Sequence, residues 1–315
     1  MLLSRVADNL YWGARYIERA EDASRLVRSY TELMIDLPTS VMSGWEPLLA
    51  LAGSSVMFEQ QHEGGTSETA IVRFLVADRG NPGSIASSID LARENLRTTR
   101  EVMPREAWQT VNDLYLYANA NASSGVDRRG RTRFLSRVIA ECQHLDGVLT
   151  TVMNRDEAYE LWRLGQSLER ADMTTRVVGV RAAAILNGEY EGDAVAGVHD
   201  EVQWMGLLRS VSALQMYQRV TRGPIDGASA VRFLVFAPAF PRSVSSCVTR
   251  MREAFTRLPQ PDITLPAVDE VERVLGTVST HATDGAELDA AMDELQVALA
   301  GIDAAVSQAF VRSSV

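Results

Sequence analysis

Two short charged motifs hold the side chains of this sequence that are best suited to chemistry. Carboxylates can transfer protons as general acids or bases, and guanidinium groups bind carboxylates and phosphates through paired hydrogen bonds. Acids and arginines that alternate within two helical turns therefore indicate either a pocket for an anionic ligand or a buried network of ion pairs. The candidates are Arg15, Glu18, Arg19, Glu21 and Arg25 in the first motif, and Glu169, Arg170, Asp172 and Arg176 in the second.

Spacing within each motif places its charges along one side of a helix. Glu18, Glu21 and Arg25 follow one another at intervals of three and four residues, which bring helical side chains together. Arg19 points about 100° further round the helix and is expected to contact a different neighbour. The same intervals recur in the second motif. Two such stripes facing each other would line a pocket suited to a carboxylate, a phosphate or a peptide terminus.

Both motifs lie beside an apolar seam, which predicts a long amphipathic helix for each. In the first helix, expected over residues 2–34, the seam recurs at alternating steps of three and four residues. Small residues near the middle of each seam predict a close approach by another helix, so the charges should be partly buried. The seams are Leu3, Val6, Leu10, Gly13, Ile17, Ala20, Ser24 and Val27, and then Leu164, Leu168, Ala171, Thr175 and Val178.

The second motif belongs to a longer internal repeat. Glu18 matches Glu169 at a shift of 151 residues (169 − 18), whereas the segment VRFLV at 72–76 recurs at 231–235, a shift of 159 (231 − 72). Trp45 matches Trp204 at the same shift (204 − 45 = 159), so the difference between the shifts (159 − 151 = 8) places an eight-residue insertion within residues 178–204. The sequence therefore predicts that a whole structural unit has been copied.

The predicted fold is all-α, a helical bundle built from two internally duplicated halves. No stretch shows the sustained alternation of a β-strand. The halves are expected at residues 1–125 and 126–315, packed as one compact unit, because residues 123–131 (SSGVDRRGR) have the composition of a solvated linker. Further expectations are a polar loop at 53–69, a helix capped by Asn81, and a late helix that starts at Asp269 after three prolines.

Composition excludes several classes of function. All 31 basic residues are arginine, so the chain lacks the lysine of a Walker A loop, of kinase and ATP-grasp nucleotide sites and of Schiff-base chemistry. The formal charge of −10 argues against nucleic acid or an anionic membrane as the main partner. Cys142 and Cys247 form no CxxC pair, and no apolar run suits a signal peptide or membrane span. We expect a cytoplasmic protein with two buried thiols and no cofactor or metal; a homo-oligomer is left open.

Several separated segments together resemble the bacterial alpha-E family, which is predicted to be all-helical and carries a recurring Glu-Arg motif. They are MLLSRVADNLYWGARYIERAEDASRL, LERADMTTRV, NPGSI leading to ARENLRTTRE, and FLVFAPAFPRSVSSC, in that order over most of the chain. The resemblance implies that the charged motifs are the family motif and adds Asp78 and Asn81 to the candidate site. Ala237 stands where relatives often carry an acid in the second copy, so a site that used Asp78 would be asymmetric.

The resemblance also implies a functional context. Such proteins are often encoded beside a circularly permuted ATP-grasp protein and a transglutaminase-like protein, and have been proposed to act with them on amide bonds. The implied function is a helical partner or substrate-binding subunit of an ATP-grasp amide or peptide ligase that modifies a peptide or a small molecule. The absence of lysine fits this role, because nucleotide chemistry would then lie on the partner.

One alternative is that the chain is an enzyme in its own right. Glu18 or Glu169 would act as general acid or base in acyl or amide chemistry, with a nearby arginine as an oxyanion clamp. Proton transfer of this kind needs a carboxylate with a raised pKa, and an adjacent arginine lowers that pKa. Binding is therefore favoured over proton transfer.

A second alternative is a metal-carboxylate helical bundle. Glu59-x-x-His62 and Glu141-x-x-His144 have the spacing found in di-iron bundles. The first pair lies in the expected polar loop, and the two pairs do not occupy equivalent points of the repeat. A solvated His62 and a packed His144 are the simpler expectation.

Overall fold

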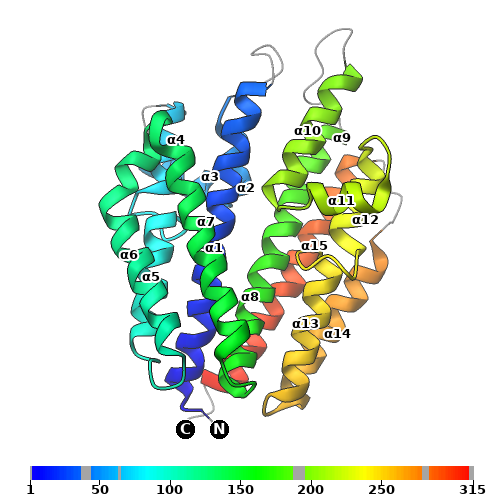
Figure 1. Cartoon of the computed structure of the whole chain (residues 1–315). Coiled ribbons are helices and arrows are strands. Elements are labelled where there is room, and N and C mark those ends of the chain that lie inside the picture. Colours follow the sequence, from blue (N-terminus) through cyan, green and yellow to red (C-terminus); the bar gives the residue numbers. More distant parts are fainter. Residues whose placement is uncertain (1, 37–43, 63–64, 187–195, 279–283, 312–315) are drawn as a thin grey trace.

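The computed structural model describes residues 2–36, 44–62, 65–186, 196–278 and 284–311 of the 315-residue chain (Figure 1). Within these ranges every regular element is a helix and none is a β-strand, which confirms the all-α class. No helix in this described part is long and apolar enough to cross a lipid bilayer. The elements are α1 (Ser4–Asp36), α2 (Glu46–Leu51), α3 (Ser55–Gln61), α4 (Glu68–Val76), α5 (Ile85–Arg97), α6 (Arg105–Val126), α7 (Arg128–Val152), α8 (Glu157–Arg176), a π-helix η1 (Val177–Ala182), α9 (Ala183–Leu186), α10 (Ala196–Ser210), α11 (Leu214–Thr221), α12 (Gly227–Phe236), α13 (Val244–Arg257), α14 (Pro261–Thr277), α15 (Gly285–Val306) and a second π-helix η2 (Ser307–Val311).

Helices α1 and α8, which carry the two charged motifs, run parallel to each other in the middle of the molecule (Figure 1). At their N-terminal ends, the backbone N–H of Leu2 donates to the Glu157 carboxylate at 2.8 Å. Further along, a Cβ added at Gly165 would lie 2.3 Å from the carbonyl oxygen of Tyr11 and 3.2 Å from the Cβ of Ala14. The missing side chain of Gly165, which lies outside the predicted seam, therefore lets the two helices approach closely. Gly13 of the first seam instead faces Leu96 of α5.

Each central helix also belongs to a group of four helices. In the first group the contacts run from α1 to α5, α6 and α7 and back to α1; in the second they run from α8 to α13, α14 and α15 and back to α8. This common order of contacts is what a repeated unit would produce, although the common origin of the halves stays a prediction. The helix contacts assign α7, which ends at Val152, to the first group. The predicted boundary between sequence halves, after Gly125, is a separate statement about the repeat and stays a prediction.

Buried seams hold the central helices in place. Leu10 and Ile17 of α1 and Leu164 and Leu168 of α8 are at most 3% exposed. Burial of one such side chain contributes about 1.5–3 kcal/mol, so the buried seams stabilise both central helices. Leu3, which was predicted to begin the first seam, is 75% exposed because it precedes the first turn of α1.

Two predictions for the first half are wrong. Residues 53–69 are not a loop throughout, since they contain α3, whose Phe58 packs into the core. Ser84, not Asn81, caps α5, because the Ser84 hydroxyl accepts the N–H of Ser87 at 3.1 Å. A polar composition misled the first prediction, and the second failed because Pro82 lies in the turn before the helix and not in its first turn.

Two later predictions are also wrong. Residues 123–131 form no extended linker: α6 reaches Val126, and Asp127 directly caps α7. Arg131, expected in solvent, is 1% exposed and donates to Glu68 at 2.8 Å. Helix α14 starts at Pro261, because proline is tolerated in a first helical turn, and it also contains Pro266.

Candidate functional site

The two charged motifs exchange partners where α1 lies against α8. Glu18 of the first motif accepts from Arg170 of the second at 2.8 Å, and Glu169 of the second accepts from Arg19 of the first at 2.6 Å. The glutamate of each Glu-Arg pair is therefore bonded to the arginine of the other pair. The two stripes themselves do not face each other across one pocket, because the described contacts place Glu21 and Arg25 in one cluster and Asp172 and Arg176 in another. Two clusters result: cluster A is Glu18, Glu21, Asp22, Arg25, Arg170 and Arg242, and cluster B is Arg15, Arg19, Glu169, Asp172, Arg176 and Asp303.

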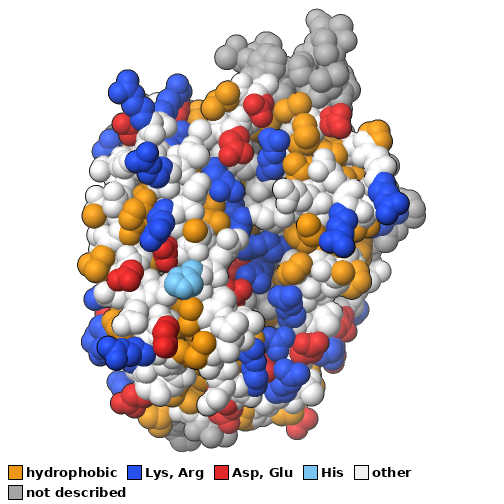
Figure 2. Space-filling model, in the orientation of Figure 1, with side chains coloured by type: hydrophobic (Ala, Val, Ile, Leu, Met, Phe, Trp, Pro, Cys, Tyr) orange, Lys and Arg blue, Asp and Glu red, His pale blue; other side chains and the backbone are white. Residues whose placement is uncertain are grey.

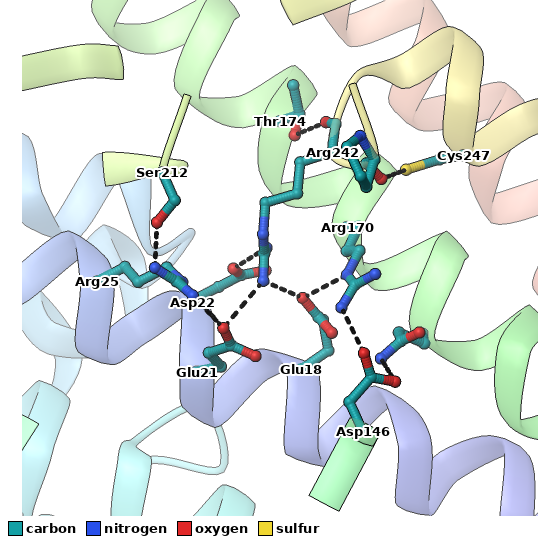
Figure 3. Close-up of polar contacts among 12 residues, drawn as sticks. Glu18, Glu21, Asp22, Arg25, Asp146, Arg170, Thr174, Ser212, Arg242 and Cys247 are labelled. Carbon is teal, nitrogen blue, oxygen red and sulfur yellow. Dashed lines mark hydrogen bonds and ion pairs between the residues drawn. The ribbon is translucent and has the colours of Figure 1, made fainter. Parts of the chain in front are cut away.

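Arg242 is the centre of cluster A (Figure 3). Its Nη2 lies 2.7 Å from Glu18 and 3.2 Å from Glu21, and its Nη1 donates to Asp22 at 2.6 Å. The loop between α12 and α13 positions this side chain, because the Arg242 carbonyl accepts from Thr174 of α8 at 2.8 Å. One guanidinium group therefore contacts all three carboxylates that α1 contributes.

The remaining members of cluster A extend it in two directions (Figure 3). Arg25 bonds Glu21 one turn away and the hydroxyl of Ser212, which follows α10. Arg170 reaches Asp146 of α7 at 3.8 Å. Basic side chains gather in the middle of the face between α7 and α13, where the two helix groups meet (Figure 2). Cluster A thus ties α7, α8, α10 and the α12–α13 loop to α1.

Burial makes the pairing in cluster A obligatory. Its six side chains belong to residues that are at most 8% exposed. Three carboxyl groups face three guanidinium groups, so the formal charges balance when all three acids are ionised. A buried charge that lost its partner would cost several kcal/mol, which makes the cluster strongly dependent on each member.

The acids of cluster A differ in their pKa values. Burial alone would raise the pKa of Glu18, but the guanidinium groups of Arg170 and Arg242 lower it below its ordinary value. Burial raises the pKa of Asp22 to about 7, since repulsion by Glu18 and Glu21 offsets the attraction of Arg242. The Oδ2 atom of Asp22 is buried without a hydrogen-bond partner among the described residues, which fits a carboxyl group that is partly protonated near neutral pH.

Glu169 is the centre of cluster B. Its Oε2 accepts from Nε of Arg15 at 2.9 Å, and its Oε1 accepts from Nε of Arg19. Arg15 also donates to Asp303 of α15 at 2.7 Å. Burial alone would raise the pKa of Glu169, but the guanidinium groups of Arg19 and Arg15 lower it by more than burial raises it. The pKa of Glu169 therefore lies below its ordinary value, and the carboxylate stays ionised.

Cluster B is more open than cluster A. Asp172 and Arg176 form an ion pair at 2.9 Å with side chains 24% and 32% exposed, whereas the matched pair, Glu21 and Arg25, is 4% and 5% exposed. A groove of 460 Å³ lies beside this pair and is lined by residues of α1, α8 and α15. The second charged stripe therefore borders a cavity, and the first is enclosed by protein.

Two substitutions between matched positions distinguish the clusters. Arg242 corresponds to Gly83 (242 − 159 = 83), and Asp22 corresponds to Met173 (22 + 151 = 173). Cluster B consequently lacks both members of the buried pair that Arg242 and Asp22 form in cluster A. The two substitutions can be read from the sequence, but only the fold shows that Arg242 and Asp22 form a buried ion pair.

Asp78 and Asn81 lie outside both clusters. Asn81 is buried in the turn between α4 and α5, where it donates to the carbonyl of Phe74 at 3.0 Å and accepts from Gly83. Asp78 accepts from the backbone of Gly80 at 2.8 Å and borders a separate cavity of 880 Å³. These two residues shape a turn, and none of their hydrogen bonds among the described residues joins them to the charged motifs.

The sequence prediction missed Asp22, Arg242 and Asp303. Asp22 had a usable signal, because it lies four residues after Glu18 and three before Arg25, on the same side of the helix. Arg242 had a usable signal, since it lies between Pro241 and Ser243, which match Pro82 and Ser84 in the predicted repeat (241 − 82 = 159). Asp303 had none, because only packing of α15 beside α8 brings it to Arg15.

Metal and thiol chemistry gain no geometric support from the described residues. They contain no group of three or more histidine, cysteine, aspartate or glutamate side chains arranged to hold a metal ion. The expectation of a solvated His62 and a packed His144 is wrong: His62 stacks on Phe58, whereas the His144 side chain is 62% exposed and lies 3.6 Å from Glu141. Cys142 and Cys247 are buried as predicted, and burial raises the pKa of the Cys247 thiol to about 11. That thiol is therefore a poor nucleophile near neutral pH.

The chain is similar to a family of helical proteins and to two curated mycobacterial proteins. The model of the Alpha-E family, described as a predicted alpha-helical domain with a conserved ER motif, matches residues 2–311. Uncharacterized proteins of Mycobacterium bovis and Mycobacterium tuberculosis are each 21% identical over 325 residues, which cover 96% of this chain and 35% of theirs. The chain thus spans about a third of the length of these curated relatives. No solved structure matches.

Proposed function

This chain belongs to the Alpha-E family, and from that premise we propose that it is a substrate-binding or accessory subunit of an ATP-grasp amide or peptide ligase. Its place is a cytoplasmic system that modifies a peptide or a small molecule, with a transglutaminase-like protein as a further partner. The observation that carries the proposal is the reciprocal pairing of the two Glu-Arg motifs, which favours binding over proton transfer.

The pKa values support a binding role. A general acid or base works best when its pKa lies near the operating pH. The pKa values of Glu18 and Glu169 are lowered, because each carboxylate, although buried, is paired with guanidinium groups. Asp22 has a pKa of about 7, but it is 1% exposed and bonded to Arg242. The motifs are therefore better suited to holding a ligand or a helix than to catalysing a reaction.

The absence of lysine supports a division of labour. Lysine contacts the nucleotide phosphates in the Walker A and kinase sites, and this chain contains none. ATP would therefore be bound and used by the partner. In the curated relatives the matched region is 35% of the chain, so it is joined to a much longer remainder.

An apolar surface offers a place for the partner to bind. Met216 and Val220 of α11 are 43% and 71% exposed and border a cavity of 690 Å³ that also contains Phe236. Exposed apolar patches of this kind commonly mark sites of protein association. Arg219 and Arg232 flank the cavity. It fits an apolar segment of the ligase that carries acidic side chains.

Co-purification tests the proposal. The tagged chain is expected to form a stable complex with the ATP-grasp protein, and ATP turnover with candidate acids and amines should require both. Val220→Glu should weaken the complex, whereas Leu116→Glu, a change at a 56% exposed position of α6, should not. If both variants bind equally, the α11–α12 surface is the wrong one. If no complex or joint turnover forms under any condition, the accessory function is wrong.

A further inference from the structure

We propose that the groove beside cluster B binds a carboxylate attached to an apolar body, such as an N-acylated amino acid or the C terminus of a peptide. The groove has a volume of 460 Å³ and lies between α1, α8 and α15. Its role as the site of the acid substrate rests on the proposed function, but binding itself does not. The charged residues that line it are Arg15, Arg19, Asp172, Arg176 and Asp303.

Unused hydrogen-bonding capacity in the groove includes donors of two arginines. Both oxygens of Glu169 and both oxygens of Asp172 already accept from arginine. A guanidinium group has five N–H donors, and among the described residues Arg19 uses only Nε in its hydrogen bond to Glu169. Arg176 uses Nε and Nη2 in its bonds to Asp172. A ligand that complements these groups must therefore supply acceptor oxygens.

Cluster A shows which acceptor cluster B lacks. In cluster A the Nη1 of Arg25 donates to the hydroxyl of Ser212. The position that matches Ser212 is Gly53 (212 − 159 = 53), and both residues have positive φ, 55° and 62°. A Cβ added at Gly53 would lie 2.5 Å from Nη1 of Arg176, so Gly53 has the same place beside Arg176 that Ser212 has beside Arg25. Nη1 of Arg176 therefore lacks the hydroxyl acceptor that Ser212 gives to Arg25.

The remaining walls of the groove select an apolar body. Leu168 of α8 and Val297, Leu299 and Ala300 of α15 line it, and Val297 is 75% exposed. Trp12 and the polar Gln296 also line it, and Trp12 lies under the Arg15 guanidinium, whose Cζ is 4.4 Å from the ring centroid. Aliphatic and aromatic walls beside arginine donors fit an acid that has an apolar side chain.

Net charge favours a carboxylate over a phosphate. The three arginines of cluster B face three acids, Glu169, Asp172 and Asp303, so the formal charges cancel. A doubly charged phosphate would find no excess positive charge, whereas a single carboxylate needs only a local fork of donors. In an amide ligase the acid substrate provides this carboxylate, so the groove would hold the group that the partner activates.

Titration calorimetry of the full chain with defined probes tests the inference. N-acetyl-leucine should bind saturably at one site, and N-acetyl-leucinamide and inorganic phosphate should bind at least about tenfold more weakly, because the amide loses charge-assisted hydrogen bonds. Equal affinity for the amide, tighter binding of phosphate, or no binding of N-acetyl-leucine at millimolar concentration would overturn the assignment.

Three variants locate the site. Arg176→Gln removes donors, Gly53→Ser supplies the hydroxyl that Ser212 supplies in cluster A, and Val297→Trp fills the groove at an exposed position without touching a charge. Each should lower the affinity for N-acetyl-leucine about tenfold or more. Arg273→Gln, in an exposed pair with Glu270, should not. Unchanged affinity in all three variants contradicts the site.

The same variants separate this inference from the proposed function. Arg176→Gln should still co-purify with the ATP-grasp protein, because the groove and the α11–α12 surface have no lining residue in common. Loss of ligand binding with an intact complex fits both proposals. An intact complex without any ligand binding in the unaltered chain leaves the accessory function standing and removes the carboxylate site.

Discussion

Arg242 connects residues that are 220 positions apart in the sequence, and its effect on stability should be large. Arg242→Gln would leave Glu18, Glu21 and Asp22 buried with too few cations. We expect a loss of about 3–5 kcal/mol in the free energy of unfolding, measured by chemical denaturation at pH 7. Arg273→Gln is the control, because exposed ion pairs contribute about 0–1 kcal/mol. Equal effects would mean that cluster A is not obligatory.

Asp22 should make stability depend on pH. Burial raises the pKa of Asp22 to about 7 in the native state, against about 3.9 in an unfolded chain. Between these values the native state binds a proton that the unfolded state does not, so this group lowers the free energy of unfolding as pH rises from about 4 to 7.

Asp22→Asn tests this pH dependence. Asparagine keeps the shape and cannot ionise, so the decrease in the free energy of unfolding between pH 5 and pH 8 should become smaller than in the unaltered protein. Denaturant titrations at both pH values measure it. An unchanged slope would show that Asp22 is ionised throughout this range.

At the level of single elements, the contact between α1 and α8 depends on Gly165. Gly165→Ala places a Cβ 2.3 Å from the carbonyl oxygen of Tyr11, so the helices must move apart. We expect a destabilisation of about 1–3 kcal/mol, as found for overpacked interiors. Thermal or chemical unfolding monitored by circular dichroism measures it.

Gly147 of α7 provides the matched control. A Cβ added there meets nothing within 4 Å, so Gly147→Ala should stabilise the chain by about 0.5–1 kcal/mol through helix propensity alone. If Gly165→Ala also stabilised the protein, α8 would have room to shift, and the close approach would not be essential for packing.

At the scale of the whole molecule, cross-paired charges should couple the two helix groups. Glu18 and Arg170 lie in different groups, as do Arg19 and Glu169. Separation of the groups would expose buried carboxylates without their partners, so we expect one cooperative unfolding transition. Calorimetry and circular dichroism should give the same midpoint. Two resolved transitions would show that the groups are stable apart.

Much of this architecture could be predicted from the sequence. The period of the seams determined that residues around Glu18 and Glu169 form helices, and the spacing of three and four residues determined that each acid lies near its arginine. These features depend on neighbours within two helical turns. The same reasoning failed at residues 53–69 and 123–131, because polar composition does not distinguish a short surface helix or a helix terminus from a loop.

Only the tertiary structure decided which charges meet. The exchange of partners between the Glu-Arg pairs, the insertion of Arg242 and the contact of Asp303 with Arg15 all join helices that are distant in sequence. The sequence by itself determined the helices, their buried faces and the charged stripes, since these follow from local periodicity. The burial of cluster A and the openness of cluster B depend on which elements pack over each, and that packing is a property of the folded chain as a whole.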